Sequence, residues 1–107
     1  MNTEIDTRTE TLTFTIGGDL VSSTANLLRP QITALLEAPD GAAKWMLFRL
    51  DLTAAKMVDS VGLNFIVSIL KAVQKRGAKM QVVCRNQNVH RTLVFTRLDK
   101  HVELILA

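Results

Sequence analysis

A serine hydroxyl and an aspartate carboxylate stand side by side in the stretch Asp59-Ser60-Val61-Gly62-Leu63. A long helical pattern of apolar residues begins there, so Ser60 is expected in the first turn of a helix. The free amides and the dipole at a helix N-terminus are compatible with an added phosphate at such a position. The plainer interpretation is that Ser60 is an N-cap or first-turn residue and that Asp59, which would repel a phosphate, serves in capping or loop bonding.

Two further residues, one before this stretch and one within it, also have structural interpretations. Asp51 follows a short and almost continuously apolar run, Trp45 to Leu50, and is expected to bond amides of the loop that leads to Ser60. Gly62 lets another backbone approach closely, either for a partner or for tight packing of the helix on a sheet.

The patterns of known enzymes and metal sites do not fit. Ser60 is not part of a Gly-x-Ser-x-Gly elbow, and Gly17-Gly18 lacks the lysine of a phosphate-binding loop. His90 and His101 have no ligand spacing with Cys84, so we expect no metal site. We therefore expect neither an enzyme nor a cofactor, and a hydrolase that uses Ser60 is kept as the alternative.

Strand and helix patterns alternate along the chain, beginning with the fault-free apolar alternation of Thr11 to Ile16. The expected elements are an edge strand around 3–7, a strand over 11–16, a helix over 25–36, a central strand over 45–50, a helix over 60–76, a strand over 80–84, a helix that starts at Asn86 or Asn88, and a closing strand over 101–106. Pro30 lies inside the first helix and should kink it or cost it a hydrogen bond. The order predicts a single α/β domain with a mostly parallel mixed sheet and packed helices.

The helix over 60–76 is apolar around an unusually wide arc. A helix that lies on a sheet needs an apolar stripe of only about 100°, and this arc is roughly twice as wide. Either other helices cover the excess, or Val61 and Phe65 are partly exposed and contact a partner. Phe14, Leu47 and Ile66 are expected in the core, and the run over 45–50 is expected to be buried on both faces.

Composition fits one ordinary globular domain of 107 residues, with 48% hydrophobic and 21% charged residues. No apolar run reaches the length of a membrane span, the polar N-terminus does not resemble a signal peptide, and one cysteine suits the cytoplasm. Residues 1–59 carry five basic and eight acidic residues, a net charge of −3, and residues 60–107 carry eight and two, a net charge of +6. A solvated helix face explains the basic half better than nucleic acid does.

The order of Asp51-Leu52-Thr53, Met57-Val58-Asp59-Ser60 and Gly62-Leu63 resembles the signature of STAS domains, most of all that of bacterial anti-sigma factor antagonists. Gly18-Asp19-Leu20 is similar to the glycine-acid-leucine that ends an earlier strand in that family. The likeness covers about Leu12 to Ile105. It implies one STAS domain over residues 1–107.

The resemblance also implies a function. In the family, the serine that matches Ser60 is phosphorylated by an anti-sigma factor that is a serine protein kinase, and a PP2C-type phosphatase reverses the modification. The implied protein is cytoplasmic, acts on sigma-factor-dependent transcription without binding nucleic acid or membrane, and allows a weak homodimer. The residues expected to bind the partner are Asp59, Ser60, Val61, Gly62, Leu63 and Phe65. The alternative within the family is a STAS subunit of a stressosome-like or lipid-transport complex that is never phosphorylated.

Overall fold

The fold is described from a computed structural model, over residues 2–6, 10–36 and 45–107. Strands and helices follow one another as the sequence predicts, and Asn86, not Asn88, caps the third helix by accepting hydrogen bonds from the amides of Asn88 and Val89. The elements are β1 (Asn2–Asp6), β2 (Thr11–Thr15), α1 (Ser22–Leu36), β3 (Leu47–Leu52), α2 (Ser60–Lys75), β4 (Lys79–Cys84), α3 (Gln87–Phe95), the 3-10 turn η1 (Leu98–Lys100) and β5 (Glu103–Leu106).

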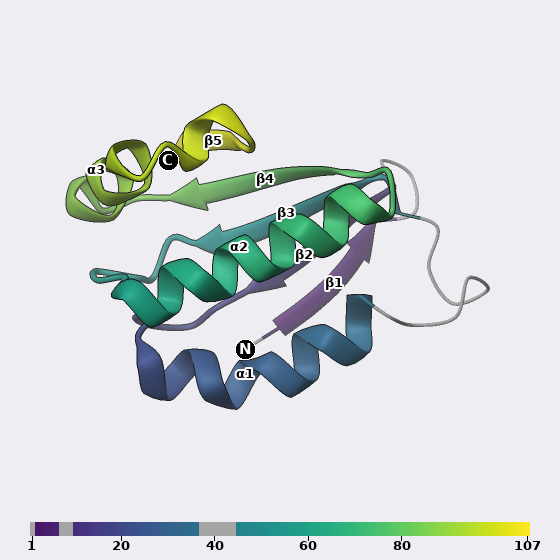
Figure 1. Ribbon diagram of the computed structural model, residues 1–107, viewed down its shortest axis with the longest axis horizontal. Coiled ribbons are helices and arrows are strands. Elements are labelled where there is room, and N and C mark those ends of the chain that lie inside the picture. The colour runs from purple at the N-terminus through teal and green to yellow at the C-terminus, as the bar shows by residue number, and fades with distance from the viewer. Residues whose placement is uncertain (1, 7–9, 37–44) are drawn as a thin grey trace.

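The five strands form one mixed sheet in the order β1-β2-β3-β4-β5. β1 runs antiparallel to β2, and the other three neighbouring pairs are parallel. Each parallel pair needs a crossover, and α1, α2 and α3 with η1 supply them in turn (Figure 1). This confirms the predicted α/β fold with a mostly parallel sheet. The edge strand expected around 3–7 is β1, and its last predicted residue, Thr7, lies outside the described residues.

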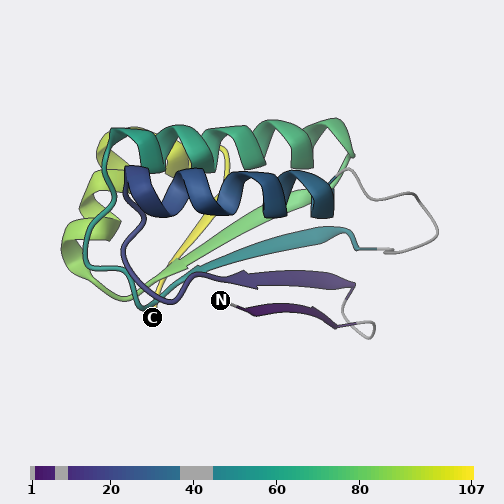
Figure 2. The same cartoon turned by 90° about the horizontal axis from the view of Figure 1, so that it is seen from below.

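α1 and α2 lie side by side on one face of the sheet (Figure 2). No helix of the described residues covers the opposite face (Figure 2), and side chains along β3 accordingly alternate: Phe48, Leu50 and Leu52 are buried, and the residues between them are half-buried. The expectation that the run over 45–50 is buried on both faces is therefore wrong, and so is the placement of Leu47 in the core. Phe48 takes that place.

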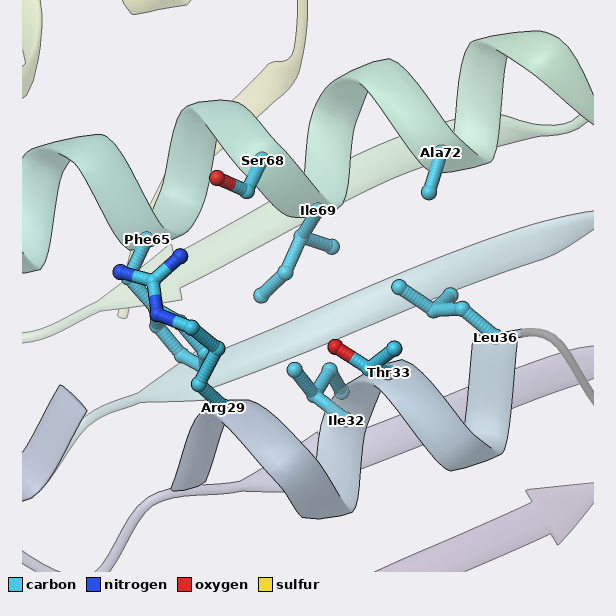
Figure 3. Close-up of a pocket in the computed structure, with 8 residues that line it drawn as sticks. All are labelled: Arg29, Ile32, Thr33, Leu36, Phe65, Ser68, Ile69 and Ala72. Carbon is cyan, nitrogen blue, oxygen red and sulfur yellow. The ribbon is translucent and has the colours of Figure 1, made fainter. Parts of the chain in front are cut away.

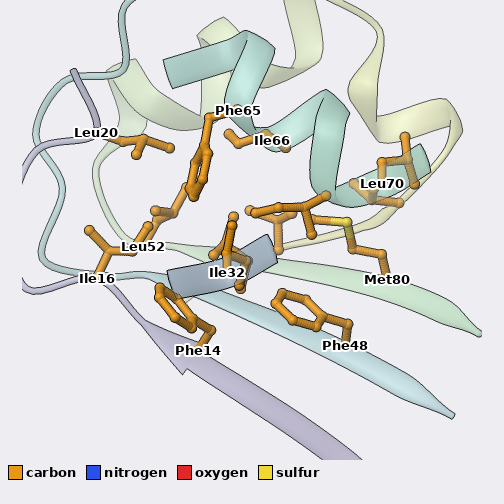
Figure 4. Packing of buried hydrophobic residues seen from close by; sticks show 14 of the residues in the cluster. Phe14, Ile16, Leu20, Ile32, Phe48, Leu52, Phe65, Ile66, Leu70 and Met80 are labelled. Carbon is orange, nitrogen blue, oxygen red and sulfur yellow. The ribbon is translucent and has the colours of Figure 1, made fainter. Parts of the chain in front are cut away.

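The core fills the space between the sheet and the helices (Figure 4). Phe14 and Ile66 are buried there, which confirms both predictions. Phe65 is 0% exposed, so the expectation that it is partly exposed is wrong, because α1 packs beside α2 and covers that side of the wide apolar arc. Val61 is half-buried, as expected. The plainer interpretation of the arc, cover by another helix, is thus correct for Phe65.

Pro30 is tolerated because it lies on the outer surface of α1. The helix continues past it to Leu36, and both Pro30 and Asn26 are exposed. A proline at this position removes the amide that would bond the Asn26 carbonyl, and water can take its place at an exposed site. Within the described ranges, no helix is long and apolar enough to cross a membrane.

Candidate functional site

The loop between β3 and α2 is fastened to the loop that precedes α1. Leu20 and Val58 form an isolated parallel bridge. The amide of Leu20 donates to the carbonyl of Met57 at 3.0 Å, and the amide of Asp59 donates to the carbonyl of Leu20 at 3.2 Å. The amide of Lys56 donates to Asp19 Oδ1 at 2.7 Å. These bonds hold in place the backbone of the loop that leads to Ser60.

Asp51 orders the start of the same loop. Its Oδ1 accepts from the amide of Thr53 at 2.9 Å and from the Thr53 hydroxyl at 2.8 Å. Its own carbonyl accepts from the amide of Ile16 at 3.0 Å, which ties the end of β3 to the end of β2. The side chain thus makes a local turn of the kind that aspartate favours.

Asp59 caps two helices at once. Its Oδ1 accepts from the amide of Gly62 at 2.8 Å, in the first turn of α2. Its Oδ2 accepts from the amide of Ser22, the first residue of α1, at 2.9 Å. Both helix N-termini therefore converge on one carboxylate, where the two dipoles favour negative charge. The sequence indicated capping of the second helix, but the bond to Ser22 spans 37 positions and no local pattern could reveal it.

Ser60 is the first residue of α2, and its side chain is exposed. Within the described part of the chain, its hydroxyl has no hydrogen-bond partner. The hydroxyl is therefore open to an approaching enzyme. Because the Asp59 carboxylate already holds the amides of Gly62 and Ser22, a phosphate on Ser60 would add charge to the surface instead of replacing an internal cap.

Gly62 is required where the two loops meet. A Cβ on Gly62 would lie 2.2 Å from the carbonyl oxygen of Leu20. That oxygen also accepts the amide of Asp59, so it cannot withdraw without loosening the site. Gly62 is buried, and the backbone that approaches it closely is the loop before α1, not a strand of the sheet as the structural interpretation expected.

Apolar side chains surround Ser60 on the outside. Met57 is 57% exposed, and Val61 and Leu63 are half-buried. Met57, Ser60, Val61 and Leu63 form a candidate contact surface for a partner, which we call the α2 docking surface. Phe65 cannot belong to it because it is buried against α1. The sequence analysis missed Met57, whose place directly before Val58 and Asp59 was the available signal.

The remaining reactive residues lie apart from this site. Cys84 is buried at the end of β4, and burial raises the pKa of its thiol, which keeps the sulfur protonated and unreactive. His90 lies on α3, and His101 lies between η1 and β5. Among the described residues, no three His, Cys, Asp or Glu side chains come together in a group that could hold a metal ion.

Known proteins share this architecture. A model of the STAS domain matches residues 2–107. A candidate anti-sigma factor antagonist from Thermotoga maritima is 23% identical, with a TM-score of 0.83 over 99% of this chain and 86% of that chain. The phosphorylated form of SpoIIAA from Bacillus is 14% identical, with a TM-score of 0.71 over 99% and 89%. The unphosphorylated form of SpoIIAA is described as an anti-sigma factor antagonist.

A further solved structure with the same fold carries another description. A sulfate transporter family protein from Wolinella succinogenes is 13% identical, with a TM-score of 0.73 over 95% of this chain and 80% of that chain. A comparison with curated protein sequences finds no match. Because the sequence identities are 13–23%, the likeness to these solved structures shows a shared fold.

Proposed function

The chain belongs to the STAS domain family, and we propose that it is an anti-sigma factor antagonist whose binding is switched by phosphorylation of Ser60. In the unphosphorylated state it binds an anti-sigma factor that is also a serine kinase, and a sigma factor is released. Phosphorylation of Ser60 by that kinase ends the binding, and a PP2C-type phosphatase restores it. The protein acts in the cytoplasm and influences transcription through its partner without contacting nucleic acid.

The observation that carries this proposal is the setting of Ser60. Its hydroxyl is exposed and free of internal bonds, yet the backbone under it is held by Asp59, Leu20 and Gly62. A kinase can reach such a hydroxyl without unfolding the domain. A rigid loop also presents the α2 docking surface in one geometry, which lowers the entropy cost of binding.

The switch follows from charge and burial. A phosphoserine carries nearly two negative charges at neutral pH. A partner packed on Val61 and Leu63 would force that phosphate out of water beside the carboxylate of Asp59. Burying an unpaired charge costs several kcal/mol, which is enough to abolish an interface of ordinary affinity.

Two serines provide a matched test. Ser60 is the first residue of α2 and Ser22 is the first residue of α1, both are exposed, and both helix starts are capped by Asp59. Ser60→Ala protein is used as bait in a pull-down from the native host, and we expect it to retain a serine kinase. That kinase is then incubated with ATP and wild-type, Ser60→Ala or Ser22→Ala protein.

We expect wild type and Ser22→Ala to become phosphorylated and Ser60→Ala to remain unmodified, as read by phosphopeptide mass spectrometry. A phosphate on Ser22, or none on any variant, would contradict the proposal. The second outcome would favour a structural STAS subunit that is never phosphorylated.

A further inference from the structure

A hollow of about 210 Å³ lies between α1 and α2 (Figure 3). Its floor is apolar and consists mainly of Ile32, Phe65 and Ile69. Polar groups stand only at its mouth, where Arg29 and Thr33 come from α1 and Ser68 comes from α2. The hollow therefore joins an apolar interior to a polar opening.

Among the described residues that line the hollow, Arg29 alone is charged. Its side chain is half-buried and reaches across to α2, with the guanidinium carbon 5.8 Å from the centre of the Phe65 ring. No carboxylate of the described residues pairs with it. A guanidinium presents five N–H donors in a planar fork, so Arg29 offers an unused site for an anion.

The hydroxyls at the mouth narrow the choice of anion. Ser68 donates its proton to the Asn64 carbonyl at 2.9 Å, so Arg29 and Thr33 are the described lining residues with free side-chain donors. These match the two oxygens of a carboxylate, which binds an arginine fork in a bidentate way. Inorganic phosphate has no apolar part to cover Ile32, Phe65 and Ile69, so a carboxylate that carries an apolar tail fits the hollow better.

The volume sets the size of the rest of the ligand. A dry protein cavity of about 150 Å³ holds one benzene molecule. The hollow is somewhat larger, and it is smaller than the about 300–1,000 Å³ of a pocket for a drug-sized ligand. We propose that the groove between α1 and α2 binds a small monocarboxylate of about six to eight carbons, all of which except the carboxylate carbon form an apolar tail. Its carboxylate lies on Arg29 and Thr33 and its tail on Ile32 and Ile69.

The test uses hexanoate as the probe and follows backbone amides of the full chain by NMR. We expect saturable shifts in residues of α1 and α2 that face the groove. Hexanamide has the same tail without the charge, and inorganic phosphate has charge without the tail. Both should bind at least tenfold more weakly than hexanoate.

Three variants locate the site. Arg29→Gln should weaken hexanoate binding at least tenfold, and Arg91→Gln, which removes an exposed cation on α3, should leave it unchanged. Ala72→Leu fills the groove from α2 and should weaken hexanoate and hexanamide alike. This variant decides the question if Arg29→Gln fails to fold. Shifts that do not saturate, shifts outside the groove, or equal affinity in wild type, Arg29→Gln and Ala72→Leu would overturn the proposal.

Discussion

At the scale of single residues, Asp59 does more than shape the surface beside Ser60. One carboxylate holds the first turns of α1 and α2 through the amides of Ser22 and Gly62. The site and the packing of the two helices therefore depend on the same side chain. A partner that moves Asp59 would also disturb both helix starts.

Asp59→Ala should lower the free energy of unfolding by about 2 kcal/mol, because it removes two caps that are each worth about 1 kcal/mol. Asp59→Asn keeps one side-chain oxygen and should lose about half as much. Urea unfolding followed by circular dichroism measures both. If Asp59→Ala stayed within about 0.5 kcal/mol of wild type, the double cap would not contribute to stability.

Gly62 offers a second test at this scale. Gly62→Ala should cost about 1–3 kcal/mol, because the new Cβ meets the backbone oxygen of Leu20. Gly17 is the control, since a Cβ there has no atom within 4 Å. Thermal melts of both variants should show a clear loss for Gly62→Ala and almost none for Gly17→Ala. Equal melting temperatures would mean that the loops do not meet as described.

At the scale of elements, the sequence predicts the strands and helices well because periodicity is a local property. The apolar alternation of β2 and the stop signal at Gly77, which has φ +82°, both report the structure of their own segment. What covers an element is a tertiary property. The sequence could not show that one face of β3 lacks a helix, which moves Leu47 out of the core.

The same limit applies to the site. The order of Asp51, Asp59, Ser60 and Gly62 indicates a loop that leads into a helix. In the structure Asp51 orders the start of that loop through Thr53, and Asp59 caps the helix through the amide of Gly62. The prediction that Phe65 is partly exposed failed because helical periodicity gives only the direction of a side chain around the helix axis. The depth of a side chain depends on α1, which lies far away in the sequence.

Because buried and half-buried side chains alternate along β3, truncating two adjacent residues should lower the free energy of unfolding by different amounts. Phe48→Ala should lower stability by about 3–5 kcal/mol, because Phe48 is 0% exposed and its removal leaves a cavity. Leu47→Ala should cost less than about 2 kcal/mol, the lower end for a fully buried leucine, because Leu47 is half-buried on the open face. Urea midpoints of the two variants distinguish them. A reversed order would invert the assignment of faces along β3.

At the scale of the whole molecule, the proposed modification lies on the surface of the domain. Ser60 is exposed, and its hydroxyl makes no bond that the described structure would lose on phosphorylation. The dipole of α2 favours a phosphate by about 0.3–1 kcal/mol, and the charge of Asp59 opposes it. The effect of the phosphate should therefore fall on binding and not on folding.

Phosphorylated protein should accordingly unfold within about 1 kcal/mol of the unmodified protein. Circular dichroism of both forms across a urea series provides the measurement. Spectra of the two native forms should overlay. A change of helix content on phosphorylation would replace the surface switch with a conformational one.

The most direct test of the central claim is calorimetry of the retained kinase against unmodified protein, Ser60-phosphorylated protein, Ser60→Ala and Ser60→Asp. We predict that phosphorylation weakens binding at least a hundredfold, about 2.8 kcal/mol, that Ser60→Ala binds like unmodified protein, and that Ser60→Asp falls between because it carries about half the charge. Equal affinities for all four would contradict the claim that Ser60 is the switch.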